Sequence, residues 1–115
     1  MHELGIVFHV IDTVNEIIEE NKVAKVNSVT VEIGEVSLVI PSYFEDCWKW
    51  AVGKQTTPIH DARIVMETIP AVTYCEGCEK TYETVKYGKI CPYCGSEHTY
   101  LLQGNEFNIK ELEVE

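Results

Sequence analysis

The sequence predicts an α+β fold, in which two helices pack on a small three-stranded sheet that an inserted four-cysteine module interrupts. Three observations lead to this prediction. Two segments repeat apolar residues at the helical period, others alternate apolar and polar residues as strands do, and four cysteines stand in two close pairs before the last alternating segment. Two amphipathic helices need a common apolar surface to cover, and one face of a small sheet provides it.

The first helix is predicted from Leu4 to about Asn21. Its apolar side chains recur three and four residues apart, and its acidic side chains fall on the opposite face. The apolar set comprises Leu4, Val7, Val10, Ile11, Val14, Ile17 and Ile18, and the acidic set comprises Asp12, Glu16, Glu19 and Glu20. Because the pattern begins almost at the first residue, we expect the amino terminus to lie against folded structure.

The second helix is predicted to begin at Pro41, because proline is well tolerated in the first turn of a helix. Gly53 is placed to end it. Its predicted inner face comprises Phe44, Cys47, Trp48, Ala51 and Val52. Cys47 is therefore interpreted as a small buried hydrophobic residue and not as a ligand.

Three longer strands and one short strand are predicted from alternating patterns. The longer ones are residues 28–36 (SVTVEIGEV), 62–72 (ARIVMETIPAV) and 106–115 (EFNIKELEVE). In the last of these the alternation changes phase near Lys110 and Glu111, which predicts a bulge or bend. Residues 99–103 (TYLLQ) are expected to form the short strand.

The chain is predicted to divide into two domains. From Tyr74 onward the sequence has few large aliphatic residues, and the alternating pattern resumes only after Gly104 and Asn105. We therefore expect residues 1–73 and 105–115 to form an α+β domain and residues 74–104 to form an inserted cysteine-containing domain.

The composition argues against several classes of partner. Acidic residues outnumber basic ones by 19 to 9, which gives a net charge of −10. Because nucleic acids bind clustered positive charge and the Lys and Arg residues are scattered, we expect no nucleic-acid partner. No apolar run approaches the roughly 18 residues that span a membrane, and no secretory signal is visible. We therefore expect no membrane association and a cytoplasmic location, where cysteines serve as metal ligands or buried thiols.

Cys75, Cys78, Cys91 and Cys94 form the pattern C-x2-C-x12-C-x2-C. Two residues between cysteines let the backbone curl so that both sulfurs converge on one ion, and two such knuckles complete a tetrahedron of thiolates. We predict a zinc-ribbon-like module whose four cysteines bind a structural Zn(II) ion and which depends on that ion for folding. A rubredoxin-like iron centre is the main alternative. Redox C-x-x-C chemistry is less favoured, because neither pair follows a strand and opens a helix.

The first residues, MHEL, place several nitrogen atoms close together. The terminal amine, the backbone nitrogen of His2 and its imidazole can form fused chelate rings, and the Glu3 amide nitrogen is close enough to join. Metals that prefer square-planar nitrogen ligands, such as Ni(II) and Cu(II), suit this set better than zinc does. The residues alone leave open that histidine stands at position two by chance.

The remaining histidines carry weaker signals. His98 lies four residues after Cys94, and we hypothesise that it tunes the zinc site or replaces a thiolate when the pH falls or nickel binds. His9 and His60 are expected to face solvent.

The motifs in combination resemble a known family. They are MHEL opening an amphipathic helix, VTVEIGEVSLVIP before an aromatic helix, the CxxC…CPYCGS segment and the closing GNEFNIKELEVE. In this order, and over nearly the whole chain, they resemble the HypA/HybF family of nickel-incorporation accessory proteins of nickel–iron hydrogenase maturation. The chain departs from the family in Gly5 and Ile6 and in the short segment between its cysteine pairs, but neither departure removes a ligand.

The resemblance implies that His2 and neighbouring backbone nitrogens, including that of Glu3, bind a transferable Ni(II) ion and that the four cysteines bind zinc. It implies a nickel metallochaperone that is not an enzyme. Its expected partners are a nickel-binding maturation GTPase (HypB type) and the hydrogenase large-subunit precursor, with urease maturation proteins left open. A monomer and a homodimer are both compatible with the sequence.

The residues alone leave two other classes of function open. One is a zinc-ribbon module for protein or nucleic-acid interaction, and the other is a rubredoxin-like iron electron carrier. The sequence shows no nucleophile–base pair and no phosphate-binding glycine loop, which agrees with a protein that is not an enzyme.

Overall fold

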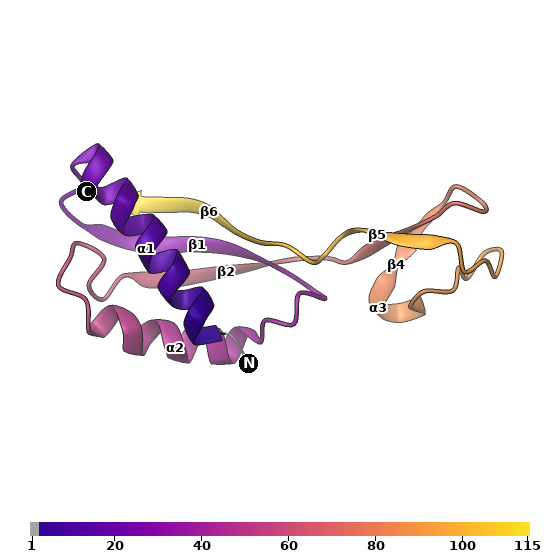
Figure 1. The fold of residues 1–115 in the computed structure, drawn as a ribbon, viewed down its shortest axis with the longest axis horizontal. Helices are drawn as coiled ribbons and strands as arrows, with labels where there is room; N and C mark the ends of the chain where they lie inside the picture. The colour runs from indigo at the N-terminus through magenta and orange to yellow at the C-terminus, as the bar shows by residue number, and fades with distance from the viewer. Residues whose placement is uncertain (1–2) are drawn as a thin grey trace. The chain divides into compact units, whose positions relative to one another are not determined.

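The computed structural model describes residues 3–115, and within them it contains three helices and six strands (Figure 1). The elements are α1 (Glu3–Asn21), β1 (Val26–Gly34), α2 (Pro41–Gly53), β2 (Arg63–Ile69), β3 (Val72–Cys75), β4 (Thr81–Glu83), α3 (Thr84–Tyr87), β5 (Thr99–Gln103) and β6 (Phe107–Val114). One sheet has the order β2-β1-β6 and the other the order β4-β3-β5. The predicted α+β class is confirmed. Within residues 3–115, no helix has the length and apolar character needed to cross a membrane.

The chain divides into two compact units. The first contains the residues up to Val31 together with Val39–Glu67 and Asn108–Glu115, and the second contains Glu32–Leu38 and Thr68–Phe107. The second unit therefore includes the whole cysteine segment and also a short stretch that follows most of β1. The assignment of nickel binding to residues 1–73 with 105–115, and of zinc binding to residues 74–104, stays a prediction.

Helix α1 buries most of its predicted apolar stripe. Its buried apolar residues are Val7, Val10, Ile11, Val14 and Ile18. Leu4, which was expected to belong to this stripe, is 42% exposed. The reason is that the buried face passes through Glu3 and Val7, one turn apart, so that Leu4 lies at its margin. Each fully buried aliphatic side chain contributes roughly 1.5–3 kcal/mol, and this stripe therefore fixes α1 in the first unit.

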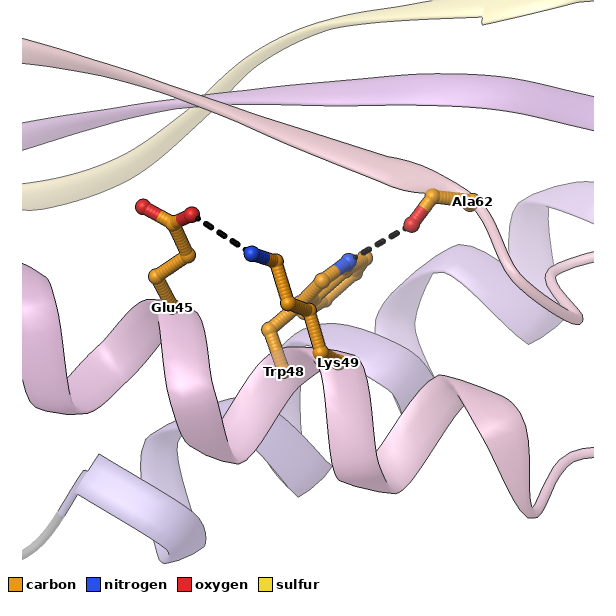
Figure 2. Close-up of polar contacts among 4 residues, drawn as sticks. All are labelled: Glu45, Trp48, Lys49 and Ala62. Carbon is orange, nitrogen blue, oxygen red and sulfur yellow. Dashed lines mark hydrogen bonds and ion pairs between the residues drawn. The ribbon is translucent and has the colours of Figure 1, made fainter.

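Trp48 anchors helix α2 to the start of β2. Its indole Nε1 donates a hydrogen bond of 2.8 Å to the backbone oxygen of Ala62, and its ring stacks on Phe44. Figure 2 shows this bond and, beside it, the 3.0 Å ion pair between Lys49 and Glu45, all on the side of α2 that faces β2. Burial of an indole is favourable only when its N–H is satisfied, as it is here.

Strand β1 lies between β2 and β6 and is buried along most of its length. Strand β2 keeps the predicted alternation, because Ile64 and Met66 are half-buried while Arg63, Val65 and Glu67 are exposed. A continuous strand over residues 62–72 was expected, but β2 ends at Ile69. Pro70 has no N–H to donate to a sheet, and the strand that follows it, β3, pairs in the other sheet.

Within the second unit, the backbone segments at Gly34, Ala71 and Gly104 approach one another closely. A Cβ atom on Gly34 would collide with the backbone oxygen of Gly104, and one on Gly104 would collide with Ala71. The Ala71 N–H donates to Glu35 Oε1 at 2.9 Å, and the Val36 N–H donates to the Gly104 oxygen at 2.8 Å. Only glycine lets these segments come so near, so the two glycines are required by packing.

Strand β3 forms the centre of the second sheet, antiparallel to both β4 and β5. The predicted short strand at residues 99–103 is confirmed as β5, whereas β4 and the single-turn helix α3 had no clear periodicity in the sequence. In the first sheet, burial along β6 changes phase between Ile109 and Leu112, as the sequence suggested. The bulge itself stays a prediction.

Trp48→Phe tests the anchoring of α2. The ring remains apolar but the buried oxygen of Ala62 loses its donor, so the free energy of unfolding should fall by about 1–3 kcal/mol. Chemical denaturation followed by circular dichroism would measure it. Trp50→Phe is the matched control, because Trp50 is 55% exposed and the change should cost less than about 0.5 kcal/mol. Equal losses in the two variants would contradict the role given to the indole.

Candidate metal centre

The structure brings the four predicted cysteine sulfurs together. All four sulfurs lie within 4.8 Å of one another. The Sγ atoms of Cys75 and Cys94 are 3.6 Å apart, and so are those of Cys78 and Cys91. A tetrahedral ion with bonds of about 2.3 Å to sulfur would hold its ligands about 3.8 Å apart, so the donor set fits zinc. It fits iron equally well, because iron accepts the same thiolate geometry.

The two knuckles share one backbone design. In the first, the Glu79 N–H donates to the Cys75 oxygen and the Cys75 N–H donates to the Lys80 oxygen, at 2.8 and 2.9 Å. In the second, the Gly95 N–H donates to the Cys91 oxygen and the Cys91 N–H to the Ser96 oxygen, at 2.9 and 3.0 Å. Each pair of bonds closes a tight turn that points both sulfurs of the knuckle in one direction.

Each turn needs a residue with positive φ at the same position, four residues after its first cysteine. In the second knuckle this is Gly95, at φ 73°, where glycine was expected to supply a permissive backbone. In the first knuckle it is Glu79, at φ 58°, which carries a conformational cost of roughly 1–2 kcal/mol. Because the first knuckle has Glu79 and not glycine at this position, the sequence alone did not show that the two turns share one conformation.

Burial and backbone donors set the ionisation of the thiols. Burial and a hydrogen bond with Cys91 raise the pKa of Cys78 to about 12. Burial also acts to raise the pKa of Cys91, but the N–H groups of Cys94 and Tyr93 donate to its sulfur and lower it to about 7. An N–H donor stabilises the charged thiolate, whereas a buried neighbour without a cation favours the neutral thiol. All four sulfurs can therefore ionise together only around a positive ion.

The apolar core around the sulfurs is small. Cys75, Tyr82 and Cys91 form the buried cluster, with Cys78 packed against it, while Cys94 is exposed. The Tyr82 hydroxyl donates to the Gly88 oxygen at 2.8 Å and so ties the segment between the knuckles to β4. Cys75 and Cys91 are thus both candidate ligands and core residues. A bound ion would crosslink the two knuckles, which the small apolar core alone holds together only weakly.

Of the predicted nickel ligands, the structure describes only Glu3. His2 is outside the described residues. Glu3 begins α1, and its side chain is 3% exposed. Its Oε2 accepts a hydrogen bond of 3.2 Å from the N–H of Ile40, the residue that precedes α2. This carboxylate contact was missed, because nothing in the sequence links residues so far apart.

The other candidate residues are not part of the sulfur cluster. The His98 side chain is exposed, while the backbone oxygen of His98 accepts from the Glu76 N–H in the first knuckle at 2.9 Å. Its proposed exchange with a thiolate stays a prediction. Cys47 was expected on the buried face of α2, but it is only half-buried and lies beside the buried stripe of that helix. His9 and His60 are exposed, as expected.

Comparison with known proteins finds relatives that match this chain along its length. A family model described as "Hydrogenase/urease nickel incorporation, metallochaperone, hypA" matches residues 1–114. The hydrogenase maturation factor HypA of Actinobacillus succinogenes is 35% identical over 115 residues, and the hydrogenase maturation factor HybF of Klebsiella pneumoniae is 30% identical, each match covering 100% of both chains.

Solved structures share the fold. The solution structure of a HypA protein has a TM-score of 0.74 at 25% identity and covers 99% of this chain and 96% of that one. That of the Ni metallochaperone HypA from Helicobacter pylori has a TM-score of 0.69 at 24% identity and covers 99% and 97%.

Metal removal should act on one unit only. Chelation is expected to unfold the second unit, whose core is small, while the first unit keeps its apolar core. Both tryptophans lie in the first unit and five of the six tyrosines in the second, so tryptophan fluorescence should persist while near-ultraviolet tyrosine circular dichroism is lost. Cys47→Ser, outside the cluster, should respond like the unaltered protein. A tyrosine signal that survives chelation would refute this.

Zinc binding should release protons. The raised pKa values of Cys78 and Cys94 keep both thiols protonated at neutral pH, so at least about two protons must leave when the ion binds. The apparent zinc affinity should therefore rise with pH through the neutral range. Calorimetric titration in buffers of different ionisation enthalpy measures the release. An affinity that does not change with pH would show that the sulfurs are not the ligands.

Proposed function

The chain belongs to the HypA family of hydrogenase and urease nickel-incorporation metallochaperones, and from this membership we propose that it binds one Ni(II) ion at its amino terminus and delivers it to a maturing nickel–iron hydrogenase. The observation that carries the proposal is the cage of four cysteine sulfurs, which all lie within 4.8 Å of one another. Such a cage has no open coordination position, and a permanent ion in it cannot serve as cargo. A transferable ion therefore needs a second site.

The amino terminus supplies donors of a different kind. The terminal amine, the backbone nitrogen and imidazole of His2, and the Glu3 backbone nitrogen form a nitrogen-rich set that Ni(II) accepts in a planar arrangement. A chelate at a chain end can be opened one ligand at a time by an acceptor, which makes transfer kinetically accessible. The four cysteines, in contrast, take zinc as a permanent structural ion.

The Glu3 carboxylate supports this site indirectly. Its hydrogen bond to the Ile40 N–H holds the first residue of α1 against the start of α2. Ile40 directly precedes α2, so the Glu3 carboxyl group lies at the amino end of that helix, where the helix dipole is positive. The contribution of Glu3 to nickel binding is then its backbone nitrogen, while its side chain fixes the point from which the chelate extends.

The partners follow from this role. A nickel-binding maturation GTPase of the HypB type would act with the protein, and the hydrogenase large-subunit precursor would receive the ion in the cytoplasm. No bond of a substrate is broken in such a transfer, so the chain needs no catalytic residues. Delivery to urease maturation proteins would use the same chemistry.

Nickel titration tests the amino-terminal site. His2→Ala and a variant with one residue added before Met1 should each lower nickel affinity by more than about tenfold, while zinc content stays the same. The added residue keeps the imidazole but moves the amine, so it separates a terminal chelate from a lone histidine ligand. His9→Ala is the matched control, because His9 is an exposed histidine on α1. Unchanged affinity in both altered proteins would disprove the site.

A further inference from the structure

Helices α1 and α2 both expose large apolar side chains. On α1, Leu4 is 42% exposed and Phe8 38% exposed; on α2, Tyr43 is 48% exposed and Trp50 55% exposed, with Cys47 half-buried between them. We call these five residues the helix-pair patch. Single exposed apolar residues are ordinary, but a group with three aromatic rings is characteristic of protein interfaces.

On α2 the patch occupies the side away from β2. Tyr43, Cys47 and Trp50 are spaced four and three residues apart, so they form one stripe along the helix. Glu45 and Lys49 point toward β2 in Figure 2. Because residues two positions apart project to nearly opposite sides of a helix, the stripe faces away from the sheet.

On α1 the patch occupies the side next to α2. Leu4 and Phe8 share a stripe with Asn15, again at helical spacing. The Asn15 Oδ1 accepts a hydrogen bond of 2.8 Å from Thr57, which follows the end of α2. At the other end, the two helix starts are joined through the Glu3 carboxylate and lie close together in Figure 1. These two contacts join α1 and α2 at both ends, so the exposed stripes lie on two helices that pack against each other.

The patch is bordered by negative charge. Asp12 follows Phe8 by one turn of α1, and Asp46 lies one turn from both Tyr43 and Trp50 on α2. Within residues 3–115, neither carboxylate forms an ion pair. Two lysines lie near this border: Lys54 lies over the Trp50 ring at 5.9 Å, and Lys49 interacts electrostatically with Asp46 but forms its ion pair with Glu45. A chain with a net charge of −10 adds to this field.

We propose that the helix-pair patch docks a partner protein that packs an apolar side chain between the two helices and surrounds it with Lys or Arg. The aromatic rings supply desolvated contact area, and the two aspartates select a basic partner and speed its approach. The patch begins next to the proposed nickel site, so a partner docked on it would be placed to receive the ion. This inference rests on the proposed nickel transfer. Leu4 is two residues from His2, a distance of at most about 7 Å along the chain, so a docked acceptor reaches the chelate directly.

The test measures binding of the full, zinc-loaded chain to two purified probes, the nickel-binding maturation GTPase and the hydrogenase large-subunit precursor. Tyr43→Ala and Trp50→Ala should each weaken binding of one probe by about tenfold, without changing nickel affinity. Tyr100→Ala, a tyrosine of similar exposure (49%) in the second unit, is the matched control. Asp12→Asn and Asp46→Asn should slow association at low salt, and the difference should vanish near about 1 M salt.

The outcomes separate this surface from the proposed function. His2→Ala should abolish nickel binding and leave docking intact; if it leaves nickel binding intact, the chelate is wrong while the surface is still tested by Tyr43→Ala and Trp50→Ala. Failure of both probes to bind the unaltered chain, or binding that ignores both variants, overturns the docking surface. So does sedimentation showing that the patch closes a homodimer, which Tyr43→Ala converts to monomer.

Discussion

Four sulfurs held within 4.8 Å of one another are the constraint on which the second unit depends. Four thiolates so close repel one another, and four thiols give little packing energy. A divalent ion turns that repulsion into folding free energy, of roughly 10 kcal/mol or more in comparable modules. Backbone N–H groups close each of the two turns, and in the second turn the N–H of Tyr93 also donates to the Cys91 sulfur. With such a crosslink, a core as small as Cys75, Tyr82 and Cys91 would be enough to hold the unit together.

The first unit is stabilised by different means. Its helices and β1 bury a continuous set of aliphatic and aromatic side chains, and Trp48 ties α2 to the start of β2. The outer sides of α1 and α2 are not part of this core, so they can carry the exposed side chains of the helix-pair patch. Under the proposed function, the amino terminus would hold its reversible ion without putting this core at risk when the ion leaves, and the permanent and transferable metals would use chemically different donors.

The elements that local patterns could predict were those with a clear period. Helices α1 and α2 and strand β5 were predicted near their observed bounds, and the cysteine spacing predicted the sulfur cluster. The end of β2 at Ile69 was missed, although Pro70 was visible, because only pairing shows that β3 joins another sheet. The contact of Glu3 with Ile40 and the close approach of Gly34 and Gly104 join residues distant in sequence, which no local pattern reports. Glu79 was missed because its backbone conformation usually calls for glycine.

The proposed function requires two metals bound by two kinds of ligand in one chain. X-ray absorption at the nickel and zinc edges of a single sample loaded with both ions would examine both sites at once. The expected result is zinc surrounded by four sulfurs and nickel surrounded by nitrogen or oxygen alone. Sulfur in the nickel shell, or zinc displaced from its sulfurs when nickel is added, would contradict it.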